Sequence, residues 1–290
     1  WENQELLIGQ YWHPFDVPEM LPSTLSLNTG APFHAFSRHI QVRYSKKIGN
    51  LNIIGVAASQ RDYANEGPSG NKSDYMRNAI IPNLHLQLHY KLNQHLIGAG
   101  IDFKSLKPRL KTDSLYTTDK KINSTSFIAF AKIVTKNFDV KLQGSLGQNL
   151  SEHTMLGGYF EKSYNTINGE ISYGNSATMN YWIDISSKKS KWNLGIFTGF
   201  TKNLGYSDNI ANIKFNNNST FTGNFYGRGN NIDKLFRVSP RITYTSGQFN
   251  IGSEFEYTVA YYGIPNEKGE IAKSDDVANF RVLISATYNF

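Results

Sequence analysis

Apolar and polar residues alternate strictly over residues 84–90, which read Leu84-His85-Leu86-Gln87-Leu88-His89-Tyr90. Since successive side chains of a β-strand point to opposite faces, this segment has one apolar and one polar face. The same period of two recurs over 249–261 and over the last residues, 277–290. Such alternation is typical of strands that are buried on one side only. The sequence therefore predicts an all-β protein whose strands separate an apolar from a polar environment.

Twelve segments carry this strand pattern, and many of them are long. Strands of soluble sheets have about five or six residues, whereas a strand tilted by about 45° needs roughly 9–11 residues to cross a bilayer. Several predicted strands reach or exceed that length. They lie near 1–10, 36–47, 51–60, 80–92, 96–106, 123–136, 139–148, 176–188, 191–202, 234–246, 248–261 and 277–290. Pro240 falls inside one of them, and it predicts a β-bulge or a strand end there, because proline cannot donate a ladder hydrogen bond.

The connections between these strands alternate in length. Short turns alternate with long polar loops along the chain. This is the layout of an outer-membrane barrel with periplasmic turns and extracellular loops. A soluble β-sandwich is the alternative, but it would mix the lengths, and loops this long are uncommon in compact domains. The turns lie at 47–50, 93–95, 137–138, 189–190 and 246–247, and the loops at 11–35, 61–78, 107–122, 149–175, 203–233 and 262–276.

The composition agrees with a transmembrane antiparallel β-barrel. The 290 residues have a mean hydropathy of −0.43 although 13% of them are aromatic. A polar lumen and polar loops around an apolar outer band account for both values. No apolar window is long enough for a transmembrane helix, and the absence of cysteine excludes disulfides and thiolate metal sites. We expect a single barrel domain over 1–290 with about twelve strands, or sixteen if N-terminal strands precede this chain.

Signatures of catalysis and metal binding are missing from the sequence. It contains no G-x-S-x-G elbow, no P-loop and no H-E-x-x-H motif. His85 and His89 lie on one strand face, but about 13 Å apart, which is too far for one metal ion. The sequence predicts no catalytic residue, no metal and no cofactor, and an outer-membrane hydrolase with a Ser–His pair near the lipid interface stays a third alternative.

The polar faces of the predicted strands carry more basic than acidic residues. In a pore, inward Lys and Arg favour anions, although inward charges that simply pair with each other are an equal alternative. The net charge of +7 does not indicate nucleic-acid binding, because the basic residues form no stripe with stacking aromatics. Asp102 and Asp184 share the predicted inward face. The predicted pore-lining residues are Arg43, Lys91, Lys104, Lys141, Arg237, Arg241, Arg281, His85, His89, Glu254 and Glu256.

The loop 11–35 is too apolar for a loop that extends into water. It begins Tyr11-Trp12-His13-Pro14-Phe15-Asp16-Val17-Pro18 and continues with further aliphatic residues. An apolar loop after a barrel strand is best placed inside the lumen, and we expect it to narrow the channel as a constriction loop. Its predicted constriction residues are Trp12, His13, Phe15 and Asp16. The alternative is a lid or a contact surface for a neighbouring chain.

A resemblance to a known family rests on this part of the chain. Gly9-Gln10-Tyr11-Trp12, Leu21-Pro22 and Asn28-Thr29-Gly30-Ala31-Pro32 resemble the strand-plus-loop signature of DcaP-like porins. Bacteroidota members also share a segment similar to Ala58-Ser59-Gln60-Arg61-Asp62. The resemblance covers about residues 6–62. It implies a trimeric, sixteen-stranded porin that takes up small anions, notably dicarboxylates, past inward arginines such as Arg43, which would follow the inward loop. The chain departs from the family in its missing four strands and in its missing oligomerising N-terminal segment.

Two functional hypotheses follow from these patterns. The first is a porin of the bacterial outer membrane that lets small hydrophilic, anionic solutes diffuse through the lumen. Its partners would be outer-membrane lipids, the solutes, and a homotrimer or larger outer-membrane assembly, and not nucleic acid. The second is a non-conducting barrel subunit of a larger complex, whose long loops, such as 203–233 with Asn216-Asn217-Asn218, would dock the partners.

Overall fold

Twelve long strands form one continuous antiparallel path in the computed structural model, which describes residues 3–188, 191–215 and 219–290. We call these twelve strands the wall. Their order in the sheet is their order in the sequence, which confirms the predicted all-β fold with about twelve strands. The wall consists of β1 (Gln4–Trp12), β2 (Arg38–Ile48), β3 (Leu51–Ser59), β4 (Asn83–Leu92), β5 (His95–Leu106), β6 (Ile122–Val134), β7 (Phe138–Gln148), β9 (Ile171–Ser187), β10 (Trp192–Tyr206), β14 (Ile232–Ser246), β15 (Phe249–Gly263) and β16 (Ser274–Tyr288).

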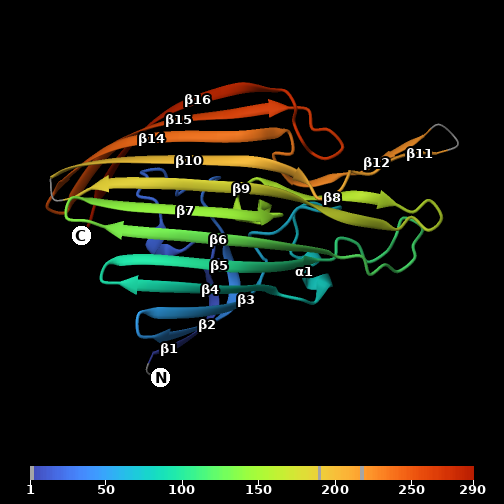
Figure 1. Ribbon diagram of the computed structural model, residues 1–290, viewed down its shortest axis with the longest axis horizontal. Helices are drawn as coiled ribbons and strands as arrows, with labels where there is room; N and C mark the ends of the chain where they lie inside the picture. Colours follow the sequence, from blue (N-terminus) through green and yellow to red (C-terminus); the bar gives the residue numbers. More distant parts are fainter. Residues whose placement is uncertain (1–2, 189–190, 216–218) are drawn as a thin grey trace.

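The wall has two edges, β1 and β16, which lie at opposite ends of the sheet in Figure 1. Tight turns join β2 to β3 and β14 to β15, where Gly49 and Gly247 have φ angles of 57° and 58°. Glycine adopts this left-handed conformation without a steric penalty, so both turns stay short. The predicted turn at 189–190 lies outside the described residues.

The wall runs straight through Pro240, so the predicted bulge or strand end is wrong. Pro240 lies opposite Ile196 of β10. The register between β14 and β15 is the same at Val238–Tyr257 and at Arg241–Glu254, so no residue is inserted between them. The missing N–H of proline removes one ladder hydrogen bond, and the neighbouring pairs hold the strand in place.

The stretches predicted as long loops contain short elements of their own. In Figure 1, β8 (Gly157–Tyr164) and the hairpin of β11 (Asn212–Lys214) and β12 (Thr220–Thr222) extend past one end of the wall. There β8 pairs with the first part of β9 and with β13 (Phe225–Arg228). One α-helix of six residues, α1 (Asp74–Ala79), and two 3₁₀ turns, η1 (Pro18–Met20) and η2 (Ser151–His153), complete the described part. Asn216–Asn218 lie outside it.

The wall has one apolar and one polar face. On β4, Leu84, Leu86, Leu88 and Tyr90 are exposed, whereas the polar residues between them are buried on the opposite side. The other wall strands continue this exposed apolar surface, which is far larger than the apolar patches of soluble proteins. We call it the outer face, since an apolar band of this kind faces lipid in barrels. None of the helices in the described ranges has the length and apolar character needed to cross a membrane.

Candidate functional site

Residues 13–37, which connect β1 to β2, lie against the polar face of the wall, and we call them the inner segment and that face the inner face. The inner segment is the blue trace that passes behind the strands in Figure 1. Phe15, Met20 and Phe33 are each at most 1% exposed. The apolar composition of this segment is thus explained by burial inside the wall.

Aromatic side chains of the wall receive the inner segment. Phe33 lies beside Phe197 of β10, with ring centroids 6.4 Å apart, in the same buried cluster as Trp182 of β9. Its ring also covers Gly199, where an added Cβ would lie 2.4 Å from Phe33 Cγ. Sequence reasoning missed these residues; the available signal was that large aromatic residues interrupt an otherwise polar face.

Wall side chains also satisfy the backbone carbonyls of the inner segment, which has little regular structure of its own. Lys141 Nζ donates to the carbonyl of Leu21 at 2.6 Å, and Gln143 Nε2 donates to the carbonyl of Phe15 at 3.2 Å. Arg237 Nη1 donates to a further carbonyl of the segment, that of Ala31, at 2.9 Å. Buried backbone groups need such partners, so these contacts fix the path of the segment.

The register of the wall places all eleven predicted pore-lining residues on the inner face. Arg43 of β2 lies opposite Val56 of β3, which lies opposite His85 of β4, and the same face continues through the later strands. Their role as channel lining stays a prediction. These residues are Arg43, Lys91, Lys104, Lys141, Arg237, Arg241, Arg281, His85, His89, Glu254 and Glu256.

Two of the cations are buried in ion pairs. Arg241 forms two hydrogen bonds with Asp184, at 2.7 and 2.9 Å. Lys104 contacts the carboxylate of Glu152 and the backbone carbonyl of Asn149. Arg241 therefore links two strands of the wall, and Lys104 links the wall to the loop that contains Glu152.

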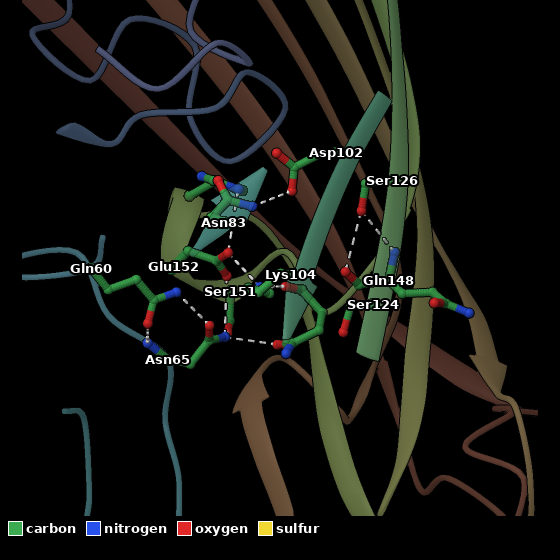
Figure 2. A network of polar contacts seen from close by, with 12 residues as sticks. Gln60, Asn65, Asn83, Asp102, Lys104, Ser124, Ser126, Gln148, Ser151 and Glu152 are labelled. Atoms are coloured by element: carbon green, nitrogen blue, oxygen red, sulfur yellow. Dashed lines mark hydrogen bonds and ion pairs between the residues drawn. The ribbon is translucent and has the colours of Figure 1, made fainter. Parts of the chain in front are cut away.

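The Lys104 contact belongs to a larger network that Figure 2 shows. Asn65, from the connection between β3 and β4, donates to Glu152 Oε2 at 3.1 Å and to Ser151 Oγ at 3.2 Å. Gln60 donates to Asn65 Oδ1 at 2.7 Å. These five residues are all buried, so their contacts join two long loops to the inner face of β5. Sequence reasoning missed it, because its residues come from distant segments.

The two inward glutamates are also engaged. Glu254 Oε2 accepts a hydrogen bond of 2.7 Å from the backbone N–H of Leu25 in the inner segment. Glu256 accepts one of 2.8 Å from Arg281 and lies 3.5 Å from Arg237. These acids are buried, at 0% and 7% exposure, and their carboxylates bind groups of the protein itself.

The exposed charged side chains of the predicted lining are basic. Lys91 and Arg281 have side chains that are 48% and 43% exposed, although Lys91 also contacts Glu19 at 2.6 Å. Arg43 is half-buried, donates to the carbonyl of Trp12 at 2.9 Å and lies over the ring of Tyr11. Cations thus dominate the part of the predicted lining that reaches solvent.

The predicted constriction residues do not share one location. Trp12 ends β1, and its ring packs against Phe36 at 5.5 Å. His13, Phe15 and Asp16 are buried between the inner segment and the wall. Their contacts fix the segment against the wall, and the narrowing of a channel by this segment stays a prediction.

Asp16 and His34 form a buried pair within the inner segment. Asp16 Oδ1 lies 4.0 Å from His34 Nε2, and neither side chain has a hydrogen-bond partner in the described structure. Burial raises the pKa of Asp16 to about 8 and lowers the pKa of His34 to about 3. Burial penalises the charged form of both groups, so both favour their neutral forms at neutral pH.

The inner histidines come together at the base of the inner segment. His85 Nδ1 lies 3.0 Å from Asp102 Oδ1, and His13 Nε2 lies 3.4 Å from the same atom. His89, four residues further along β4, contacts Gln87 instead, at 2.9 Å. Among the described residues, His13, His85 and Asp102 form the group with metal-ligand geometry.

Comparison with known proteins supports the fold. The sequence matches no protein-family model and no curated protein. The structure is similar to the outer membrane channel DcaP of Acinetobacter baumannii, with a TM-score of 0.68 and 14% identity over 98% of this chain and 71% of that chain. It is also similar to OmpT, an outer membrane protein of Vibrio cholerae, in its outer-membrane expressed form, with a TM-score of 0.55 and 12% identity over 99% and 77% of the two chains.

These similarities show the fold of an outer-membrane β-barrel. Identities this low show architecture only. Together with the exposed apolar outer face, the barrel fold assigns this chain to the outer membrane. The sequence prediction of an outer-membrane barrel is therefore confirmed.

Proposed function

We propose that this protein is a porin through which small hydrophilic, anionic solutes diffuse passively. The observation that carries the proposal is the division of charge on the inner face. The acids Glu254 and Glu256 are buried against the inner segment and the arginines, whereas Lys91 and Arg281 reach solvent. Basic side chains along a water-filled path raise the local concentration of anions.

The inner segment would set the width of the path. Its buried side is fixed to the wall by Phe33 and by hydrogen bonds from Lys141 and Arg237. A segment held on one side in this way narrows a lumen without moving during transport, which suits passive diffusion. By its sequence resemblance and its similarity to a channel structure, we propose a Bacteroidota-type DcaP-like member that assembles as a homotrimer.

A hydrolase is less well supported. Ser37 Oγ lies 2.8 Å from His153 Nδ1, and His153 Nε2 lies 3.4 Å from Glu152 Oε1, so a Ser–His–Glu series exists. All three residues are at most 4% exposed. A nucleophile must reach its substrate, and this buried serine instead links the inner segment to η2. We therefore propose a protein that is not an enzyme.

Planar-bilayer recording of the purified protein tests the porin proposal. We expect stable conductance and a reversal potential that shows anion preference in a salt gradient. Arg43→Ala and Arg281→Ala should each reduce that preference. Arg38→Ala is the matched control, because Arg38 is an exposed arginine of the same strand as Arg43 on the opposite face. Absence of conductance or a clear cation preference would contradict the proposal.

A non-conducting subunit of a larger assembly is the second candidate. The observation that favours it is the buried core that the inner segment forms with Phe130, Trp182 and Phe197 inside the wall. A filled interior stabilises a barrel without providing a path. Purification in mild detergent distinguishes the two: unrelated chains in fixed stoichiometry, together with absent conductance, would favour the subunit.

A further inference from the structure

We propose that His13, His85 and Asp102 form a binding site for a divalent transition-metal ion. The three residues come from the inner segment, β4 and β5. One ligand atom of each lies within 4.8 Å of the others. Asp102 Oδ1 is 3.0 Å from His85 Nδ1 and 3.4 Å from His13 Nε2. Two ligand atoms of a tetrahedral zinc ion are about 3.4 Å apart, given zinc–ligand distances of about 2.1 Å.

The surroundings of these residues leave polar atoms unsatisfied. His13, His85 and Asp102 are 0%, 4% and 5% exposed. His85 Nε2 has no hydrogen-bond partner in the described structure, and neither does either ring nitrogen of His39, which is 1% exposed. The His39 ring centroid lies 5.1 Å from that of His13. Buried polar groups are nearly always satisfied, so unpaired nitrogens here are consistent with a bound ion or water. The His153 ring is closer to His13, at 4.3 Å, but its nitrogens contact Ser37 and Glu152, so His39 is the further histidine with nitrogens left to bind an ion.

The donor set selects the class of metal. Two imidazole nitrogens and one carboxylate oxygen suit zinc, cobalt, nickel or copper, whereas calcium and magnesium need mostly oxygen ligands. Asn83 Nδ2 donates to Asp102 Oδ2 at 2.7 Å. This contact holds the carboxylate so that its other oxygen, Oδ1, faces the histidines, which is the usual task of an outer-shell partner.

Metal binding needs only a shift of ring protons. Phe15 N–H donates to His13 Nδ1 at 3.2 Å, so the ring proton of neutral His13 is on Nε2, which faces Asn83 Oδ1 at 2.8 Å. When Nε2 binds the metal, this proton moves to Nδ1 and the Phe15 contact is lost. The proton of His85 moves likewise from Nδ1 to its free Nε2. Asp102 binds as the carboxylate, so the protein releases no net proton. Three metal bonds then replace the Phe15 contact and the hydrogen bonds from His13 Nε2 to Asn83 and from His85 Nδ1 to Asp102.

A metal ion at this place would link the inner segment to the wall. His13 is the first residue of the segment, and His85 and Asp102 belong to neighbouring wall strands. The sequence predicted no metal site because it compared His85 only with His89 on the same strand. The proposal does not depend on channel activity.

Titration of the purified protein, after bound metal ions have been removed with a chelator, tests the site. We expect one equivalent of Zn²⁺ to bind by calorimetry and one equivalent of Co²⁺ to give the visible absorption of a low-coordinate site. His13→Gln and His85→Gln should abolish this binding, while Asn83→Ala should weaken it by about 10-fold to 100-fold. His95→Gln is the matched control, because His95 is the first residue of β5, away from the cluster, and accepts a hydrogen bond from the backbone N–H of Val134.

The outcomes separate this proposal from the porin proposal. Gel migration before and after heating shows whether each variant is folded. No stoichiometric binding by the wild-type chain, or unchanged binding by a folded His13→Gln variant, would overturn the metal site. Conductance without metal binding would overturn the site alone, and metal binding without conductance would overturn the porin alone.

Discussion

Arg241 on β14 reaches across β10 to form a two-point ion pair with Asp184 on β9, with nitrogen–oxygen distances of 2.7 and 2.9 Å. β10, the strand between them, has a glycine, Gly195, where the Arg241 side chain crosses it. An added Cβ at Gly195 would lie 2.5 Å from Arg241 Cζ. Paired guanidinium and carboxylate groups tolerate burial, so the absence of one side chain on β10 lets two buried charges meet.

Replacing this glycine should weaken the protein. In Gly195→Ala, the added methyl group overlaps the guanidinium, and we expect a loss of about 1–3 kcal/mol in the free energy of unfolding, the usual result of overpacking. Urea unfolding in phospholipid vesicles measures it. Gly144→Ala is the control, because the nearest atom to its added Cβ is 3.8 Å away. Equal stability of the two variants would show that Arg241 relaxes without losing Asp184.

A second glycine supports the inner segment. In Gly199→Ala, the new methyl group occupies the place of the Phe33 ring, whose Cγ would be 2.4 Å away. We expect Phe33 to leave the wall, so that the inner segment loosens and single-channel conductance rises and becomes noisier. Gly55→Ala, which meets nothing within 4 Å, should leave conductance unchanged. An unchanged conductance in Gly199→Ala would show that the position of the inner segment does not set the width of the channel.

The strands and their faces could be predicted because their signal is local. The alternation at Leu84–Tyr90 is visible in consecutive residues of one strand. The pairing of neighbouring strands then places residues of the same face opposite one another. Partners could not be predicted in the same way. The pairing of Lys104 with Glu152 joins residues 48 positions apart, and period two shows that a side chain faces inward but not what it meets there.

The histidine cluster illustrates the same limit. His13 and His85 are 72 positions apart in the sequence, yet both approach Asp102. Their meeting depends on where the inner segment touches the wall, and that is decided by the fit of aromatic residues such as Phe33. The short strand β8 was missed for a related reason, because it depends on an extension of β9 beyond the wall.

The stability of the inner segment should fall as pH rises from 6.5 to 8. The pKa of Asp16 is raised to about 8 by burial, so its contribution is complete below its unfolded pKa and is lost as pH approaches 8, by about 1.4 kcal/mol per pH unit. His34, whose pKa is lowered to about 3, contributes fully above its unfolded pKa and is lost only at acidic pH. The window above pH 6.5 therefore isolates Asp16.

Thermal unfolding of the detergent-solubilised protein, followed across this window, measures the effect of Asp16. Asp16→Asn removes the ionisation and should flatten the decline between pH 6.5 and 8. Asp62→Asn replaces an exposed aspartate whose side chain is 61% exposed, and it should retain the wild-type profile. A wild-type profile in Asp16→Asn would mean that the buried carboxyl does not titrate in this range.

The two faces of β16 should respond differently to the same new charge. Val282 is exposed on the outer face, and Leu283 points to the inner face opposite Glu254. Val282→Arg places a guanidinium in lipid, which destabilises barrels by about 2–4 kcal/mol near the midplane. Leu283→Arg meets water and carboxylates, so its free energy of unfolding in vesicles should change far less. A reversed order would mean that the faces of this strand are assigned the wrong way round, because the two variants differ by one position and carry the same side chain.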